Sequence, residues 1–265
     1  MFLGIDIGSS SSKAVLLDKG GAILGREVVN LGTGSGAIDD VIDVLLEKAG
    51  VDRGDILYSV VTGYGRIGYE KADTQITEIG CHAKGVYHDF PEARSIIDIG
   101  GQDAKVIRLG DGGRVDNFVM NEKCAAGTGR FFEVMARVLN CSLDDLSGLA
   151  AEAEYAVAIS STCTVFAESE VISQLSAGAS PASVAWGAHK SVAKRIAGLS
   201  GRLGLIPEIV MTGGVALNQS MVRAMEEEIE TSILVPESPQ TVGALGAAVY
   251  AKEKYESASR DQSLQ

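Results

Sequence analysis

Long apolar runs and a basic leader are both missing from this sequence. No stretch is apolar over the roughly 20 residues that a membrane-spanning helix needs. The chain passes directly into a strand pattern, Phe2 to Asp6, without the basic and apolar regions of a signal peptide. Membrane insertion and secretion are therefore not indicated, and we expect a cytoplasmic protein.

Positive charge and aromatic residues are also scarce. The 265 residues include 23 Lys and Arg against 35 Asp and Glu, a formal net charge of -12, and only 5% are aromatic. Most of the surface would repel nucleic acid or an anionic membrane, so any phosphate ligand must be held locally. The 32 glycines are typical of an α/β protein with many tight turns.

Closely spaced cysteine pairs are absent as well. The four cysteines, Cys81, Cys124, Cys141 and Cys163, form no C-x-x-C pair, which excludes a zinc ribbon and the ferredoxin spacing. Disulfides are not expected in a reducing cytoplasm.

What the chain does contain is an internal repeat. An apolar strand ending in Asp-x-Gly occurs at 3–9 and again at 96–102, and each copy is followed by a second strand, a glycine-rich turn and a third strand. Helical patterns at 38–48, 77–89, 183–202 and 222–229 complete an α/β arrangement. We place one domain at 1–95 and a second at 96–265. The C-terminal helix is expected to pack back on the first domain, and its small residues at 243–248 permit close approach of another helix.

Two matched loops each carry one cysteine. Cys124 follows a strand pattern at 115–119 and precedes a helical pattern at 130–139, and Cys163 follows a strand pattern at 157–159 and precedes a helical pattern at 165–175. Both thiols are thus predicted at helix starts. A helix N-terminus lowers a thiol's pKa and stabilises an anionic metal–thiolate centre, which makes a redox cluster the hypothesis to test.

The first repeat ends in a hairpin that can hold phosphate. Its glycines let backbone N–H groups approach an anion, its serines add hydroxyl donors and its lysine adds charge; these residues are Gly8, Ser9, Ser10, Ser12 and Lys13. No helix follows, so it is neither a P-loop nor a dinucleotide-binding loop. Taken alone, this pattern fits a tight turn that binds no ligand equally well. Two further glycine loops, at 98–103 and 210–218, favour the binding function.

This set of three loops resembles the superfamily of acetate kinases, sugar kinases, actin and heat-shock chaperone ATPases. The resemblance implies duplicated ribonuclease H-like domains with a nucleotide cleft between them. It also implies that Asp6 and Asp98 hold Mg²⁺ through water and that Gln102 orients the attacking water, because neutralising the phosphoryl group is the main catalytic need. Further nucleotide contacts are expected at Gly100, Gly101, Gly127, Gly129, Gly213 and Gly214, the last two behind the adenosine.

From spacing alone the cysteines allow three interpretations. A 4Fe–4S cluster usually takes four thiolates, so two cysteines per chain require a symmetric dimer. Alternatively, Cys81 and Cys141 complete a site within one chain, or all four cysteines are small buried hydrophobes.

The stretches 121–131 and 160–171, together with 62–66, 81–83 and 98–103, closely resemble the activators of 2-hydroxyacyl-CoA dehydratases. The likeness runs from Gly4 to about Tyr250. It implies a homodimer with one bridging, oxygen-sensitive 4Fe–4S cluster on Cys124 and Cys163, while Cys81 and Cys141 are structural. It further implies that ferredoxin or flavodoxin supplies one electron, and that ATP hydrolysis drives its transfer to a dehydratase, which then forms a ketyl radical. The chain departs from the family at Ser10 and Ser11, where threonine and alanine are common.

Other functions remain open at this stage. A small-molecule kinase, for example of an amino sugar, would need an acceptor base such as Asp103 or Glu133, and a nucleotide-dependent regulatory binder would need neither base nor cluster. The partner is also open, since a benzoyl-CoA reductase or a double-cubane cluster protein would suit a related activator.

Overall fold

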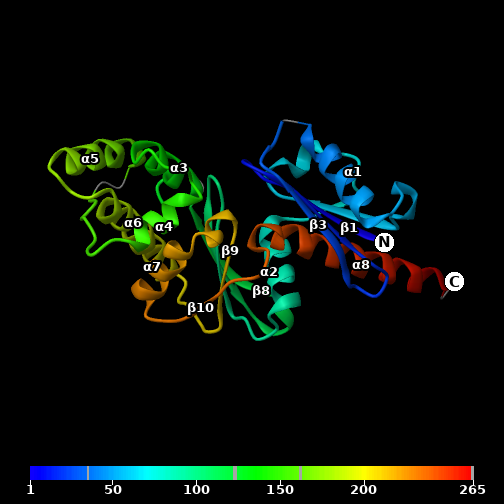
Figure 1. Cartoon of the computed structure of the whole chain (residues 1–265). Coiled ribbons are helices and arrows are strands. Elements are labelled where there is room, and N and C mark those ends of the chain that lie inside the picture. Colours follow the sequence, from blue (N-terminus) through cyan, green and yellow to red (C-terminus); the bar gives the residue numbers. More distant parts are fainter. Residues whose placement is uncertain (35, 122–123, 161–162, 264–265) are drawn as a thin grey trace. The chain divides into compact units, whose positions relative to one another are not determined.

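The computed structural model describes residues 1–34, 36–121, 124–160 and 163–263 (Figure 1). The chain forms two compact units. The first contains Met1–Ala93, Leu109–Val115 and Gln240–Gln265, and the second contains Arg94–Arg108 and Asp116–Pro239. No helix within the described residues is long and apolar enough to cross a membrane.

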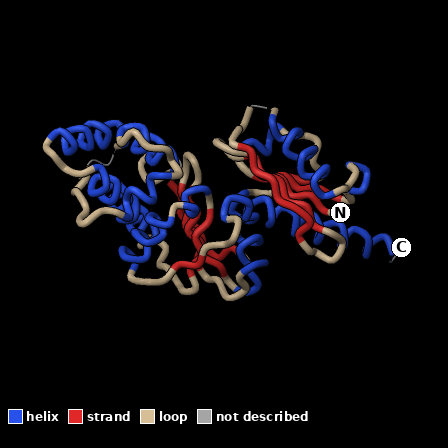
Figure 2. The backbone as a smooth tube through the Cα atoms, viewed as in Figure 1, coloured by secondary structure: helices blue, strands red, loops and turns tan. Residues whose placement is uncertain are grey.

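The first unit is a five-stranded mixed sheet covered by helices on both faces (Figure 2). Its strand order is β3-β2-β1-β4-β5, and β1 is antiparallel to β2 and parallel to β4. The strands are β1 (Phe2–Ile7), β2 (Ser12–Leu17), β3 (Ile23–Val29), β4 (Tyr58–Thr62) and β5 (Thr74–Gln75), and the helices are α1 (Ala37–Ala49), α2 (Glu78–Asp89) and α8 (Val242–Ser263).

Side-chain alternation along β1 decides which helix covers which face. Leu3, Ile5 and Ile7 pack with the apolar side of α1, whereas Phe2 packs with α8. Because successive residues of a strand point to opposite faces, Asp6 lies on the α8 side.

The small residues of α8 do allow close packing. A Cβ at Gly246 would overlap the carbonyl oxygen of Cys81 in α2, and a Cβ at Gly4 in β1 would overlap the carbonyl oxygen of Ala244. Glycine is thus required where α8 meets both α2 and the sheet.

The second unit repeats this topology, with the order β8-β7-β6-β9-β10. Its strands are β6 (Ser95–Ile99), β7 (Ala104–Leu109), β8 (Val115–Asn121), β9 (Ile209–Thr212) and β10 (Ile233–Leu234), and its helices are α3 (Gly129–Val138), α4 (Asp145–Ala151), α5 (Thr164–Ser176), α6 (Pro181–Ser200) and α7 (Gln219–Ile229). Ile97, Ile99 and the apolar sides of these helices form one core. The predicted α/β duplication is therefore confirmed.

One predicted strand is wrong. Residues 157–159 are not a strand, because this apolar segment packs on helix α6 and not beside a sheet. The amide of Val157 donates to the carbonyl of Ser183, 3.0 Å away, and a Cβ at Gly187 would overlap the carbonyl oxygen of Val157.

Candidate functional site

The first hairpin joins β1 to β2 through a tight turn. The amide of Gly8 donates to the carbonyl of Ser11 over 3.0 Å, and the turn places Ser10 at the surface and Ser9 half-buried. The hydroxyl of Ser12 is buried and donates to the carbonyl of Leu31, 2.9 Å away. Ser12 therefore holds the hairpin, whereas Ser9 and Ser10 are more open to a ligand.

Asp6 lies at the end of β1 beside Lys13. The two residues face each other in the β1–β2 register, and Lys13 Nζ lies 3.2 Å from Asp6 Oδ2. His82 of α2 is also close: a Cβ built on Gly243 would lie 3.1 Å from His82 Nε2 and 3.3 Å from Asp6 Oδ2. His82 was not among the predicted site residues, although the stretch 81–83 is part of the family resemblance.

Asp98 occupies the corresponding place in the second unit and is more tightly held. Thr212 Oγ1 donates to Asp98 Oδ1 over 2.7 Å, and Lys105 Nζ lies 3.2 Å from Asp98 Oδ2. Lys105 also contacts Asp103 Oδ2, 2.8 Å away, and only 3% of the Lys105 side chain is exposed. Neither Lys105 nor Thr212 was among the predicted site residues.

The two aspartates have matching surroundings. Each faces a lysine across an antiparallel pair and a threonine across a parallel pair; the partners are Lys13 and Thr62 for Asp6, and Lys105 and Thr212 for Asp98. Each threonine is followed by a glycine with φ near +87°, 87° at Gly63 and 86° at Gly213, where a Cβ would overlap the first strand of the unit. The charged ends of the strands are therefore a duplicated feature.

The second hairpin is joined to the first cysteine loop. Gly100 donates its amide to the carbonyl of Asp103 over 2.9 Å, which closes the turn that carries exposed Gln102. The carbonyls of Gly100 and Gly101 accept the amides of Gly129 and Arg130, each over 2.8 Å. These two hydrogen bonds join the start of α3 to the second hairpin.

Cys124 lies in a loop, and not at the start of α3 as predicted. The N-cap of α3 is Thr128, because Gly127 has φ +96°, a left-handed conformation that cannot extend the helix. Asn121 Nδ2 donates to the Cys124 carbonyl over 3.0 Å, and Arg195 Nη2 donates to Cys124 Sγ over 3.3 Å.

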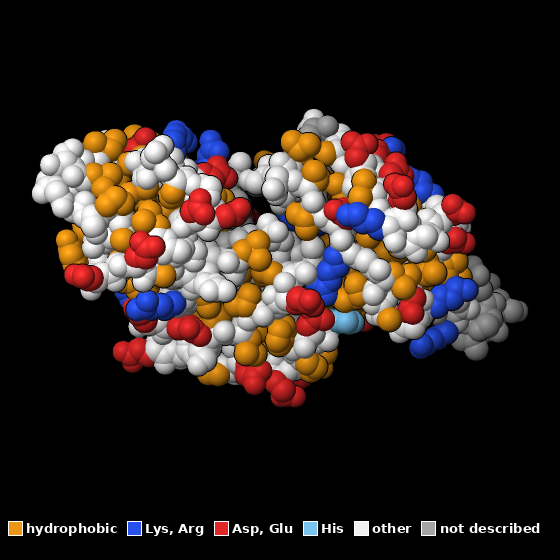
Figure 3. Space-filling model, in the orientation of Figure 1, with side chains coloured by type: hydrophobic (Ala, Val, Ile, Leu, Met, Phe, Trp, Pro, Cys, Tyr) orange, Lys and Arg blue, Asp and Glu red, His pale blue; other side chains and the backbone are white. Residues whose placement is uncertain are grey.

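Cys163 is the N-cap of α5, so its prediction at a helix start is confirmed. Its side chain is exposed. Two large apolar side chains in the first turn after it, Val165 and Phe166, are each 68% exposed, and Ile172 further along α5 is 50% exposed. Figure 3 shows hydrophobic side chains on the surface of the part of the second unit that contains α5. The motif residues 122–123 and 161–162 lie outside the described residues.

The other two cysteines differ from this pair. Cys81 is buried within α2, and burial raises its pKa to about 12. Burial and the nearby Asp145 raise the pKa of Cys141. Within the part of the chain that the structure describes, no three His, Cys, Asp or Glu side chains come together as a metal site. Cys81 and Cys141 therefore complete no such site there.

The loop after β9 is anchored by a buried histidine. Gly213 donates its amide to the carbonyl of Pro239 over 3.0 Å, and Gly214 begins a short 3-10 helix that leads to Asn218, the N-cap of α7. Asn218 Nδ2 donates to His189 Nε2 over 2.9 Å, and His189 Nδ1 donates to the carbonyl of Ala185 over 2.7 Å. Burial lowers the pKa of His189, which keeps this ring neutral.

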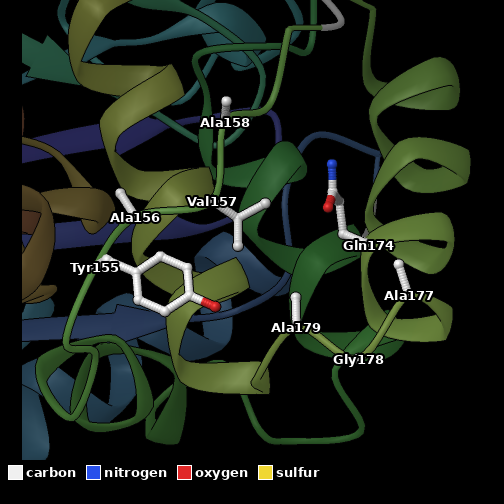
Figure 4. A pocket seen from close by; sticks show the side chains of 8 residues that line it. All are labelled: Tyr155, Ala156, Val157, Ala158, Gln174, Ala177, Gly178 and Ala179. Atoms are coloured by element: carbon white, nitrogen blue, oxygen red, sulfur yellow. The ribbon is translucent and has the colours of Figure 1, made fainter.

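A depression of about 400 Å³ lies between the 155–158 segment and the end of α5 (Figure 4). Its lining has no charged side chain; it consists of Tyr155, Ala156, Val157, Ala158, Gln174, Ala177, Gly178 and Ala179. It shares no residue with the predicted nucleotide site and is poorly suited to phosphate.

Comparison with known proteins gives these features a context. The model of the BadF/BadG/BcrA/BcrD ATPase family matches residues 3–251. The chain belongs to this ATPase family. It is 57% identical to an activator of lactoyl-CoA dehydratase from Anaerotignum propionicum over 95% of this chain and 97% of that protein.

Solved structures agree with this family membership. The activator of the 2-hydroxyisocaproyl-CoA dehydratase from Clostridium difficile, solved with bound ADPNP, is 50% identical, has a TM-score of 0.95, and is matched over 98% of both chains. A ROK family glucokinase from Streptomyces griseus shares the fold alone, with a TM-score of 0.57 at 14% identity over 95% of this chain and 99% of that one. The actin-like fold class predicted from the glycine loops is thereby confirmed.

Proposed function

We propose that this ATPase transfers one low-potential electron to a 2-hydroxyacyl-CoA dehydratase and thereby activates it for radical dehydration. The observation that carries the proposal is the near-full-length similarity to an activator of lactoyl-CoA dehydratase. Cys124 and Cys163 both lie in the second unit, and each chain would bind a cluster through these two thiols.

For nucleotide hydrolysis, Asp6 and Asp98 contribute water-mediated Mg²⁺ binding, and Gln102 orients the attacking water. The duplicated Asp–Lys pairs support this assignment, because they bring both carboxylates and cations to strand ends. Gly8, Ser9, Ser10 and Lys13 contact phosphate, with Ser12 supporting the hairpin. The backbone around Gly100, Gly101 and Gly127 also contacts the nucleotide, and Gly213 and Gly214 lie behind its adenosine.

The cluster is shared by two copies of the chain. Four thiolates are the usual ligands of a 4Fe–4S centre, and Cys124 and Cys163 supply two of them from each copy. The exposed apolar side chains of Val165 and Phe166, directly after Cys163, are the kind of surface that an interface covers. When bound, the cluster would supply one-electron redox chemistry, with ferredoxin or flavodoxin as donor. Such a centre is oxygen-sensitive and suits the reducing cytoplasm.

Iron and acid-labile sulfide content, with EPR after dithionite reduction, tests this proposal on protein purified without oxygen. Wild type and Cys141→Ala, the matched control, should each contain about two irons per chain, which is one 4Fe–4S cluster per dimer. Cys124→Ala and Cys163→Ala should each lose the cluster. Protein that hydrolyses ATP yet contains no iron would contradict the proposal and favour a small-molecule kinase.

A further inference from the structure

Arg195 on α6 forms a hydrogen bond with the sulfur of Cys124. Its Nη2 donates to Cys124 Sγ over 3.3 Å, and the side chain is partly buried. A guanidinium is always charged in proteins, so this hydrogen bond also brings a positive charge to the sulfur.

The packing around Arg195 fixes the part of α6 that carries it. Its neighbours on α6, Val192, Ala193 and Ile196, are buried in the core of the second unit, which fixes the backbone at this point. Arg195 Cδ would lie 3.0 Å from a Cβ on Gly127, so glycine at this position leaves room for the arginine beside the cysteine loop.

The cysteine loop itself is well tethered. Thr128 Oγ1 donates to the Ala125 carbonyl over 2.7 Å, and Asn121 holds the Cys124 carbonyl from the other side. The guanidinium and the sulfur are therefore both held by elements of the same unit, and their contact does not depend on an exposed, mobile side chain.

We infer that Arg195 is a positioning residue for Cys124 that also sets the reduction potential of the cluster. The inference rests on the proposed function, since it needs the cluster at Cys124. Reduction adds one electron to the centre, and a donor and positive charge at the ligating sulfur stabilise the more negative, reduced state. Arg195 therefore raises the potential and makes the cluster easier for its donor to reduce.

An EPR-monitored redox titration of the reconstituted homodimer tests this role. Arg195→Gln should make reduction about tenfold less favourable, a shift of about 59 mV to lower potential for one electron. Lys194→Gln is the matched control, because it removes one positive charge from the neighbouring, exposed position of α6 and should leave the potential unchanged. Arg195→Lys, which keeps the charge but loses the planar donor fork, should lie between wild type and Arg195→Gln.

The outcomes separate this inference from the proposed function. Iron-containing Arg195→Gln protein with the wild-type potential, or the same shift in Lys194→Gln, overturns the role of Arg195 and leaves the proposed function intact. If Arg195→Gln binds no iron, the titration of Arg195→Lys decides: a lowered potential supports the role and a wild-type potential overturns it. Wild-type protein without iron overturns the proposed function, and this inference with it.

Discussion

Replacing Lys105 by methionine tests the buried charge cluster of the second unit. Lys105 lies 3.2 Å from Asp98 and 2.8 Å from Asp103, and its side chain and that of Asp98 are each only 3% exposed. Methionine keeps most of the packing but removes the cation that faces both carboxylates. Removing one partner of a buried ion pair costs about 3–5 kcal/mol, and we expect that loss in the free energy of unfolding.

The duplication within the chain provides the matched control. Among the residues that the structure describes, Lys13 has one carboxylate partner, Asp6, and the two side chains are 13% and 9% exposed. Lys13→Met should therefore cost less, on the order of 1–2 kcal/mol.

Urea unfolding followed by circular dichroism measures the loss of stability in both variants. Adding Asp103→Asn to Lys105→Met should recover part of the loss, since one of the two charges is gone. Equal losses of stability in the two lysine variants would refute this reasoning.

Three further results are expected. In thermal unfolding, Gly246→Ala should destabilise the protein by more than about 1 kcal/mol because the new methyl group overlaps the Cys81 carbonyl. Gly198→Ala, in an open helical position, should instead stabilise it by up to about 1 kcal/mol. Because burial lowers the pKa of His189, the unfolded state takes up a proton at a higher pH than the folded state, and the free energy of unfolding should fall as the pH drops below about 6.5. The fall should be less steep in His189→Gln. Urea titrations in which wild type and His189→Gln lose stability equally steeply with falling pH would contradict this. Brief iodoacetamide treatment of apoprotein at pH 8 should label exposed Cys163 and spare buried Cys81, whose pKa is about 12, and mass spectrometry showing equal labelling would be inconsistent with the structure.

Much of the fold could be predicted from local patterns. The Asp-x-Gly repeat marks β1 and β6, and the same offset of seven residues separates Asp6 from Lys13 and Asp98 from Lys105. Only the first lysine, Lys13, was among the predicted site residues. The second could have been found by aligning the two repeats, because antiparallel pairing across equal turns places both lysines opposite their aspartates.

Other features depend on packing between distant segments. His82 comes near Asp6 because α2 and β1 both pack closely on α8, and a local sequence pattern does not predict which distant segments pack together. Arg195 follows Cys124 by 71 residues and reaches it across the core. Residues 157–159 read as a strand because apolar β-branched residues suit both a sheet and an extended segment on a helix.

Activation of a purified lactoyl-CoA dehydratase is the most direct test of the central claim. Pre-reduced protein, freed of reductant and mixed with the dehydratase, lactoyl-CoA and ATP without oxygen, should produce dehydrated thioester. A non-hydrolysable ATP analogue, or Cys124→Ala in place of wild type, should give none. Protein that carries a complete cluster and hydrolyses ATP, yet activates the dehydratase equally well without ATP or not at all, would contradict the account.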